Sequence, residues 1–296
     1  MRPKVTVGLP VYNGERHLRE AIESILGQSF ADFRLVVSDN ASTDASAEIV
    51  RGYAARDNRI HYHRNETNIG LAANFNLVFR MSESPYFRWA TSDDVTLPDF
   101  LLRCVACLDA EPGIVLAYAK TRFIDASGQP IDKKDLGLDL PSDDPGVRLR
   151  QILDAGSWVN AVLGLMRADA LAKTGLLPSY SSGDFGLLGE LCLFGKFREL
   201  PESLFLRRIH ERSSSQHVKE VGWMESYWKG RAGPFTPPLW NRCRHHFRTI
   251  RQAALPFGTK LALTGHLLRT MNWRRDRLRR ELLQSIGSRF SRSSRG

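Results

Sequence analysis

The stretch YFRWATSDDVTLPDF, residues 86–100, decides the fold. It begins with a run fit for a buried strand and passes through Asp93 and Asp94 to a helical pattern that starts near Pro98. The same succession of strand, polar turn and helix recurs along the first 120 residues. Strictly alternating strands and helices favour an open, doubly wound, mostly parallel sheet. The sequence therefore predicts an α/β fold with two adjacent carboxylates at the end of a strand.

The remaining elements follow from the spacing of the apolar residues. Periods of two predict strands at residues 4–10, 33–40, 59–65, 86–94 and 113–119. Helical spacing predicts helices at residues 14–28, 42–56, 71–82 and 98–110. Ser42 or Thr43 is suited to cap the second of these helices, and Pro98 to the first turn of the fourth.

Composition limits the class of protein. Apolar residues make up 42% of the chain and charged residues 25%, as in soluble globular proteins. Four cysteines are too few for a disulfide framework, and we expect Cys104 and Cys107 to be core residues of a helix rather than metal ligands. No apolar run resembles a signal peptide or approaches the roughly 20 residues of a membrane-spanning helix. We therefore expect a cytoplasmic protein.

Positive charge is concentrated in the C-terminal tail. The net charge is +10, yet residues 229–296 alone carry 16 Lys and Arg against Asp276 and Glu281. Helices are predicted at residues 239–255 and 258–290, the second with apolar residues at recurring spacings and a cationic block between them. The apolar positions are Leu268, Met271, Leu278, Leu282 and Ile286, and the block is Arg274, Arg275, Arg277, Arg279 and Arg280.

Two interpretations of this tail remain open. A basic amphipathic helix with Trp273 near its boundary fits attachment to the anionic inner face of a membrane. Alternatively, the apolar stripe packs on the rest of the chain or on a second subunit of a homodimer. Nucleic-acid binding is not expected, because the aromatic residues of the tail are too scattered to interleave with its arginines on one surface.

Polar residues follow four of the predicted strands or begin the next helix. These clusters are Pro10–Asn13, Ser38–Asn40, Asn65–Gly70 and Ser92–Asp94. Parallel strands direct their carboxyl ends to one edge of a sheet, where ligands bind. Neither G-x-G-x-x-G nor a P-loop is present. Adjacent carboxylates repel one another unless one is protonated or a cation binds between them. A Mg²⁺ or Mn²⁺ ion bound together with a diphosphate would remove this repulsion. The alternative is a solvated turn in which Asp94 caps the next helix.

Five stretches, in order and spacing, resemble the family 2 glycosyltransferases of the GT-A fold. They are VGLPVYNGERHLREAIESILGQSF, LVVSDNASTD, NIGLAANFN, WATSDDVTLPDFL and SSGDFGLLGELCLFGKFRELPESLFLRRIHERSSS. The resemblance covers roughly residues 4–216. It implies a nucleotide-sugar half at residues 1–120, an acceptor-side half of the same domain at 121–216, and a basic helical extension at 217–296.

The resemblance implies a donor site built from the first three clusters. Its donor-binding residues would be Pro10, Tyr12, Asn13, Glu15, Asp39, Asn68, Gly70 and Asn74. Tyr12 would lie beside the base, and Asp39 would accept from the uracil N3–H. Asp39 can equally form an Asx-turn with the backbone that follows it. Asn74 can equally be an exposed helix residue.

The resemblance also implies the metal and the catalytic base. Asp93 would bind Mg²⁺ or Mn²⁺ together with His210, with Asp94 beside them, although Thr91 stands where the family often has a first Asp. Arg208 would meet the phosphates. Asp184 would take the proton of the acceptor hydroxyl, with the plain alternative that it is a helix N-cap.

The function expected is metal-dependent, inverting transfer of a sugar from a nucleotide diphosphate sugar, UDP-linked, to a hydroxyl acceptor. A glycan or lipid-linked glycan of the cell surface is the expected acceptor. Two other classes remain: a nucleotidyltransferase that makes the activated sugar, and a non-catalytic scaffold with a basic tail that binds nucleic acid or membrane. Glu190, Trp158 and Asn160 are secondary candidates for the acceptor side.

Overall fold

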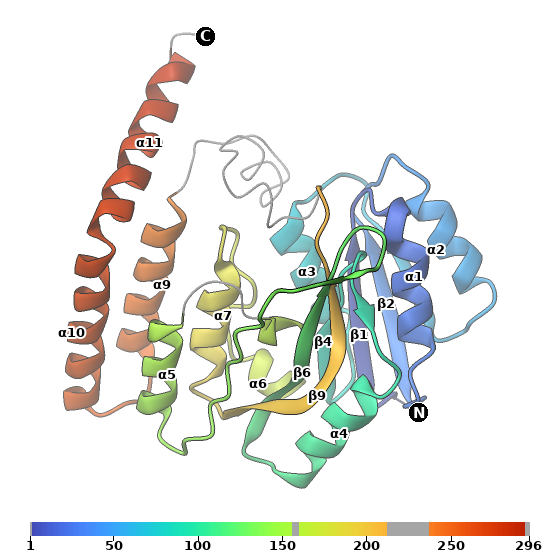
Figure 1. Ribbon diagram of the computed structural model, residues 1–296, viewed down its shortest axis with the longest axis horizontal. Helices are drawn as coiled ribbons and strands as arrows, with labels where there is room; N and C mark the ends of the chain where they lie inside the picture. Colours follow the sequence, from blue (N-terminus) through green and yellow to red (C-terminus); the bar gives the residue numbers. More distant parts are fainter. Residues whose placement is uncertain (1, 156–159, 212–236, 294–296) are drawn as a thin grey trace.

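The structure is a computed structural model that describes residues 2–155, 160–211 and 237–293, with side chains as far as Ser285. Its first part is the predicted parallel sheet (Figure 1). The strands β1 (Val5–Val11), β2 (Phe33–Asp39), β3 (Ile60–Arg64) and β4 (Tyr86–Trp89) lie side by side in the order β3-β2-β1-β4, all parallel. Val5, Val7 and Leu9 are fully buried, which explains why an almost unbroken apolar run forms β1.

Helices α1 (Glu15–Leu26), α2 (Ser46–Ala54), α3 (Leu71–Arg80) and α4 (Phe100–Ala110) complete the alternation. Two predicted helix starts are wrong. Helix α2 begins at Ser46, because Ser42 and Thr43 bind the loop after β1 instead of capping a helix. Helix α4 begins at Phe100, and Pro98 lies before it, its carbonyl accepting from the N–H of Ser29 at 2.9 Å.

The second part of the sheet is mixed. Strands β5 (Val95–Thr96), β6 (Ile114–Ile124), β7 (Pro130–Ile131), β8 (Leu165–Arg167) and β9 (Lys196–Arg208) extend it to β3-β2-β1-β4-β8-β6-β9-β5, with β7 paired to β6. Strand β8 is antiparallel to β4 and β6, and β5 is antiparallel to β9. The predicted strand at 86–94 therefore ends at Trp89. Asp93 and Asp94 lie on the short connection from β4 to β5. Strand β5 in turn pairs with β9, a distant part of the chain.

The C-terminal region is helical, as predicted. Helices α5 (Pro145–Asp154), α6 (Ala168–Leu171) and α7 (Gly183–Leu191) follow the sheet strands, and α9 (Pro238–Gln252), α10 (Phe257–Trp273) and α11 (Arg275–Ser293) form the tail. The predicted single helix at 258–290 is interrupted at Arg274, so α10 and α11 are separate elements that continue along the outer side of the molecule (Figure 1). Among the described residues no helix is long and apolar enough to span a bilayer.

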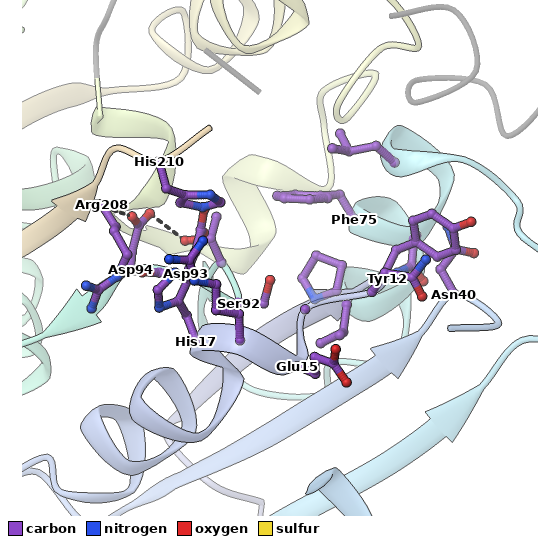
Figure 2. A pocket seen from close by; sticks show the side chains of 18 of the residues that line it. Tyr12, Glu15, His17, Asn40, Phe75, Ser92, Asp93, Asp94, Arg208 and His210 are labelled. Atoms are coloured by element: carbon purple, nitrogen blue, oxygen red, sulfur yellow. Dashed lines mark hydrogen bonds and ion pairs between the residues drawn. The ribbon is translucent and has the colours of Figure 1, made fainter. Parts of the chain in front are cut away.

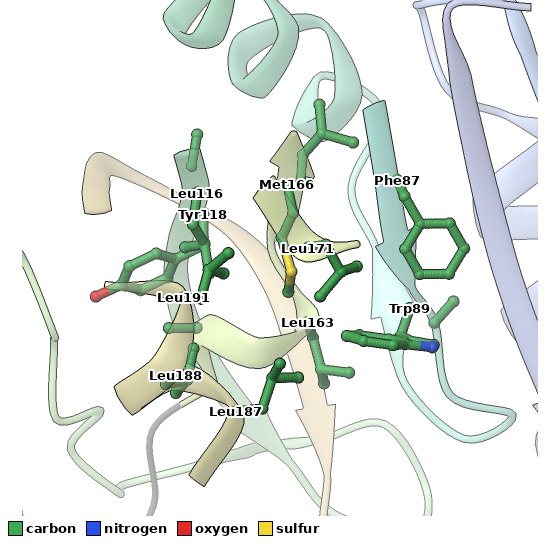
Figure 3. Close-up of a cluster of buried hydrophobic side chains, with 14 of the residues drawn as sticks. Phe87, Trp89, Leu116, Tyr118, Leu163, Met166, Leu171, Leu187, Leu188 and Leu191 are labelled. Carbon is green, nitrogen blue, oxygen red and sulfur yellow. The ribbon is translucent and has the colours of Figure 1, made fainter. Parts of the chain in front are cut away.

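One hydrophobic core joins the sheet to the tail. Figure 3 shows Phe87 and Trp89 of β4 close to Met166 of β8 and to Leu187 of α7. Leu239 of α9 and Leu263 of α10 belong to the same cluster of buried residues. Helix α9 packs on α7, and α10 packs on α5. Of the predicted apolar stripe, Leu278 is buried and Met271 half-buried, whereas Leu268 and Leu282 are exposed, so packing accounts for part of the stripe only.

Candidate active site

A cavity of about 830 Å³ opens at the edge of the sheet where the parallel strands end. The lining residues come from the loop after β1, the start of α1, the turns before and within α3, the β4–β5 connection and the end of β9. Among them are Pro10, Tyr12, Asn13, Glu15, His17, Asn40, Asn68, Asn74, Phe75, Thr91, Ser92, Asp93, Asp94, Arg207, Arg208, His210 and Glu211. The predicted convergence of sequence-distant polar clusters on one crevice is therefore present.

The loop after β1 is fastened to the loop after β2. The N–H of Asn13 donates to Ser42 Oγ at 3.0 Å, and Asn13 Oδ1 accepts from the N–H of Thr43 at 2.8 Å. Glu15 Oε2 accepts from the N–H of Ala45 at 2.9 Å. Asn13 has φ 50°, in the left-handed region that asparagine tolerates. These bonds hold the first loop so that Tyr12 stands exposed at the cavity (Figure 2).

Asp39 is fully buried and does not line the cavity. Its Oδ1 accepts from the N–H of Ser42 at 2.8 Å, which is the Asx-turn predicted as the alternative. Its other oxygen accepts from Tyr62 Oη at 3.0 Å and pairs with Arg64. The next residue, Asn40, lines the cavity in its place. The role of Asp39 in base recognition stays a prediction.

A network of asparagines forms the wall beside Tyr12. Asn40 Nδ2 donates to Asn68 Oδ1 at 2.8 Å, and Asn68 Oδ1 also accepts from the N–H of Gly70 at 2.8 Å. Gly70 does not line the cavity but begins α3 with φ 87°, a conformation that glycine adopts at low cost. Asn74 is buried, not exposed as one interpretation had it, and bonds Ser38 and Asn65. Figure 2 shows Phe75 at the same end of the cavity as Tyr12 and Asn40.

The opposite end of the cavity is acidic. His210 Nε2 lies 3.0 Å from Asp93 Oδ2, and Asp93 keeps 28% of its side chain exposed. Asp94 is buried and accepts from the N–H of Arg208 at 2.8 Å and from the hydroxyl of Thr91. Burial and the neighbouring Asp93 raise the pKa of Asp94 to about 6. Asp94 therefore anchors the β4–β5 connection to β9, and Asp93 presents its carboxylate to the cavity.

Arg208 has a different environment from the one predicted. Its side chain is 2% exposed, and it donates to the carbonyls of Asp93 and Asp125 and pairs with Glu20 of α1. In Figure 2 the guanidinium points away from the middle of the cavity. Arg208 lines the cavity while its guanidinium is bound by these groups, and its contact with a phosphate stays a prediction. The strand alternation explains the difference, because consecutive residues of β9 face opposite sides of the sheet.

Two cavity residues escaped the sequence analysis. His17, in the first turn of α1, is 9% exposed, and its ring lies 5.2 Å from the ring of His210, centroid to centroid. Burial and the nearby Arg208 lower its pKa to about 4, so its imidazole is neutral at pH 7. Arg207 donates to Asn160 and lines the cavity from β9. His17 lies in the first of the five stretches that carry the resemblance and Arg207 in the last, but neither was singled out there, although a histidine one turn after the first loop was a signal.

Of the predicted acceptor-side residues, Asn160 contacts Arg207. Asn160 is buried, donating to Thr121 Oγ1 at 3.0 Å and to Asp135 Oδ1 at 3.2 Å, so it positions Arg207. Asp184 is the second residue of α7 and does not line the cavity. Burial raises its pKa, an effect that Arg207 and Arg242 oppose. Glu190 pairs with His245 of α9 at 2.9 Å, away from the cavity lining. Trp158 lies outside the described residues.

The end of the cavity that contains Asp93 and His210 suits a metal ion that binds together with a phosphate-bearing ligand. Within the described ranges, no three His, Cys, Asp or Glu side chains converge as a metal cage. Asp93 Oδ2 and His210 Nε2 nevertheless face one another across 3.0 Å in the cavity. A carboxylate oxygen and a neutral imidazole, with phosphate oxygens supplying the other positions, fit a Mg²⁺ or Mn²⁺ ion.

Known proteins resemble this chain in sequence. Residues 6–139 match the model of Glycosyl transferase family 2. "Putative glycosyltransferase EpsE" of Bacillus subtilis (strain 168) is 41% identical over 108 residues, 36% of this chain and 39% of that protein. "Putative teichuronic acid biosynthesis glycosyltransferase TuaG" of the same strain is 27% identical over 132 residues, 45% of this chain and 52% of that protein. The chain thus spans about two fifths to one half of the length of these relatives.

Solved structures share the fold. S. aureus TarS 1-349 in complex with UDP-GlcNAc superposes with a TM-score of 0.67 at 18% identity, covering 92% of this chain and 72% of that one. The mannosyltransferase PcManGT from Pyrobaculum calidifontis, in complex with GDP-Man and Mn²⁺, gives a TM-score of 0.56 at 17% identity, covering 97% and 86%. The mixed, mostly parallel sheet with a helical C-terminal region is therefore the GT-A type that the sequence predicted.

Proposed function

We propose that this chain transfers a sugar from a nucleotide diphosphate sugar to a hydroxyl group of a glycan, because residues 6–139 match the model of Glycosyl transferase family 2. The observation that carries the proposal is the division of the cavity into two unlike ends. Tyr12, Asn40 and Phe75 offer an aromatic and amide environment for a base and ribose, and Asp93 with His210 offers ligands for a metal diphosphate (Figure 2).

The donor is UDP-linked in this proposal. The resemblance of the first loop and of TarS, which was solved with UDP-GlcNAc, supports a uracil nucleotide. The Oδ1 atoms of Asn40 and Asn68 are already bonded within the asparagine wall, so it is the NH2 group of Asn68 that can donate to a carbonyl of a pyrimidine. Tyr12, held exposed by the bonds of Asn13 and Glu15 to the next loop, is placed to stack on the base.

The diphosphate end would hold a Mg²⁺ or Mn²⁺ ion through Asp93 and His210, and the bound ion would offset the charge of the departing nucleoside diphosphate. Arg207 adds a second positive charge from β9. The buried Asp94 keeps Asp93 at the cavity edge by binding the backbone of Arg208. The protein therefore supplies electrostatic stabilisation of the leaving group chiefly by orienting one carboxylate, one imidazole and one guanidinium.

Inverting transfer requires a base on the acceptor hydroxyl, opposite the leaving group. We assign this role to Asp184, whose pKa is raised by burial and which interacts electrostatically with Arg207. A raised pKa makes a carboxylate a stronger proton acceptor. Asn160, which is itself bonded to Asp135, accepts a hydrogen bond from Arg207 and so holds this guanidinium at the cavity. The acceptor would be a cell-surface glycan or a lipid-linked glycan at the inner face of the membrane.

The test is incubation of the full chain with a panel of nucleotide sugars, with and without Mn²⁺ or Mg²⁺. Release of the nucleoside diphosphate from one of them is expected, and it should be abolished by chelator. Release of pyrophosphate from a nucleoside triphosphate and a sugar phosphate would instead identify a nucleotidyltransferase. Binding of every nucleotide sugar without turnover on any acceptor would favour a non-catalytic scaffold.

The metal assignment is tested with Asp93→Ala. This variant should fold normally and lose the Mn²⁺ dependence of nucleoside diphosphate binding, measured by calorimetry with and without the ion. Asp99→Ala is the matched control, because Asp99 is an acid that precedes α4 and does not line the cavity. Full activity of Asp93→Ala would remove the metal from the mechanism.

A further inference from the structure

Helix α10 carries the two most exposed large apolar side chains of the described part of the chain. Phe257 is 81% exposed, Trp273 78% and Leu261 64%, and Leu268 is 54% exposed on the same helix. Leu283 of α11 reaches 68%. Side chains of this size are seldom left in water in a contiguous row, and such rows mark interaction surfaces.

Helical spacing places these side chains together. Phe257, Leu261 and Leu268 are four and seven residues apart, so they lie on one stripe of α10. The opposite side of the helix is the one that packs, because Leu263, Leu267 and Thr270 are buried. The core is thus complete without the stripe of Phe257, Leu261 and Leu268, which we call the α10 stripe.

Along the chain, the α10 stripe is followed by the cationic residues of α11. After the interruption at Arg274, exposed arginines follow along α11, among them Arg275 and Arg279. Figure 1 shows α11 continuing from α10 along the outer side of the molecule. Exposed Arg269, Arg277 and Arg280 add charge, against Asp276, while Glu281 is buried and bound to Leu239 and Arg277. The occupant of this face must accept both apolar insertion and several positive charges.

We propose that the α10 stripe, with Arg275 and Arg279, docks on an anionic lipid surface. Leu261 and Phe257 would enter the boundary between headgroups and acyl chains, and the arginines would lie over acidic headgroups. A second copy of the chain is the competing occupant of this face, and a change of oligomeric state is the outcome that would identify it. The proposal rests on the proposed function only for its purpose, which is access to a lipid-linked acceptor.

Sedimentation with vesicles tests the surface with the full chain and no donor. Vesicles of phosphatidylcholine with 30% phosphatidylglycerol, a composition chosen for the assay at roughly the charge of an anionic leaflet, should pellet the protein at low salt. Pure phosphatidylcholine should not. Binding should weaken steeply as the salt concentration rises, since screening shortens the reach of surface charges.

Two double variants separate the two contributions. Arg275→Gln/Arg279→Gln should lower the partition coefficient about 25-fold, because each basic residue near such a surface contributes about 1 kcal/mol. Phe257→Ser/Leu261→Ser should lower it by at least tenfold, because apolar area no longer enters the boundary. Arg34→Gln/Arg56→Gln and Leu102→Ser remove exposed residues of the same kinds on the far part of the sheet and should leave it unchanged.

Three results would overturn the proposal: no pelleting at low salt, equal loss in the control variants, or a change of oligomeric state with Phe257→Ser/Leu261→Ser in place of lost vesicle binding. Light scattering after gel filtration reads the last of these. Nucleotide-sugar binding by the variants, measured without vesicles, should match that of the wild type. Failure of vesicle binding therefore leaves the proposed transfer intact, and failure of transfer leaves the docking surface intact.

Discussion

Arg207 and Arg208 are neighbours on β9 with opposite surroundings. Arg208 is buried and donates to backbone carbonyls of two separate segments, so its removal leaves those carbonyls without a donor. Each unpaired buried group costs about 1–3 kcal/mol. We expect Arg208→Met to lower the free energy of unfolding by about 2–4 kcal/mol, measured by urea denaturation. Arg207→Met is the matched comparison. Its free energy of unfolding should fall less than that of Arg208→Met, and its turnover should fall more. Equal effects of both variants on stability and on turnover would contradict this division of roles.

Asp184 can be separated from a simple helix cap by an isosteric change. Asp184→Asn keeps the size and can still accept a hydrogen bond, but it cannot take the acceptor proton. Turnover should fall by about 10²–10⁴-fold, the usual worth of general-base assistance. Donor affinity should stay within about twofold, because Asp184 lies outside the lining of the donor cavity. If turnover stays within tenfold of the wild type, the residue only begins α7.

At the scale of elements, α7 and α9 meet through glycines of α7. A Cβ added at Gly186 would lie 2.5 Å from Tyr180 Oη and 3.1 Å from the ring of His245, and one at Gly189 would lie 3.0 Å from His246. Gly186→Ala should therefore destabilise the protein by about 1–3 kcal/mol through overpacking. The matched control is Gly265→Ala on α10, where nothing lies within 4 Å. There, thermal melting should show a gain of about 0.5–1 kcal/mol from helix propensity.

The same contact contains a pH-dependent group. Burial, with Arg242 and His245 nearby, lowers the pKa of His246 to about 3. The unfolded chain takes up this proton below about pH 6.5, whereas the folded chain does not. Stability is therefore lost as the pH falls from about 6.5 towards 3, by about 1.4 kcal/mol for each unit between the two pKa values.

His246→Leu removes that proton from both states. Its free energy of unfolding should depend less on pH than that of the wild type when urea titrations at pH 7.5 and 5 are compared. His17, whose pKa is lowered to about 4, acts in the same direction in both proteins, and Asp94, whose pKa is raised to about 6, acts in the opposite one. The difference between the two proteins isolates His246. If the free energies of unfolding of the two proteins differ by the same amount at pH 7.5 and at pH 5, His246 is charged in the folded protein.

At the scale of the whole molecule, the tail is part of the core. Leu263, Leu267 and Leu278 are buried, and Glu281 of α11 accepts from the N–H of Leu239 at the start of α9. A chain that ends at residue 256 loses this helix cap and about 1.5–3 kcal/mol for each buried leucine. We expect it to melt well below the full chain and to aggregate on gel filtration. A truncated protein with an unchanged melting temperature would show that α10 and α11 fold apart from the rest.

The alternating first half of the fold was predictable, and the second half was not. Apolar periodicity identifies β1 and α1 because each buries one continuous face. Strands β8 and β5 are too short for a period to show, and they owe their existence to partners far along the chain. The site followed the same rule. The motifs pointed to Asp93 and His210, which line the cavity. The different surroundings of Arg207 and Arg208 depend on which way each residue of the strand faces, and the bond of Asn160 to Arg207 depends on tertiary contacts.

The position of β6 has a consequence for how the protein is made. In the finished sheet β6 lies between β8 and β9, which are synthesised after residue 164 and after residue 195. While the chain emerges from the ribosome, β6 therefore has two open edges over most of its length until β8 and β9 are made, since β7 pairs only with Phe123 and Ile124. Open edges are templates for unwanted pairing. Residues 6–139, which match the family model, therefore do not form a complete folding unit. Expressed alone, this segment would expose the edges of β6 that β8 and β9 cover in the full chain.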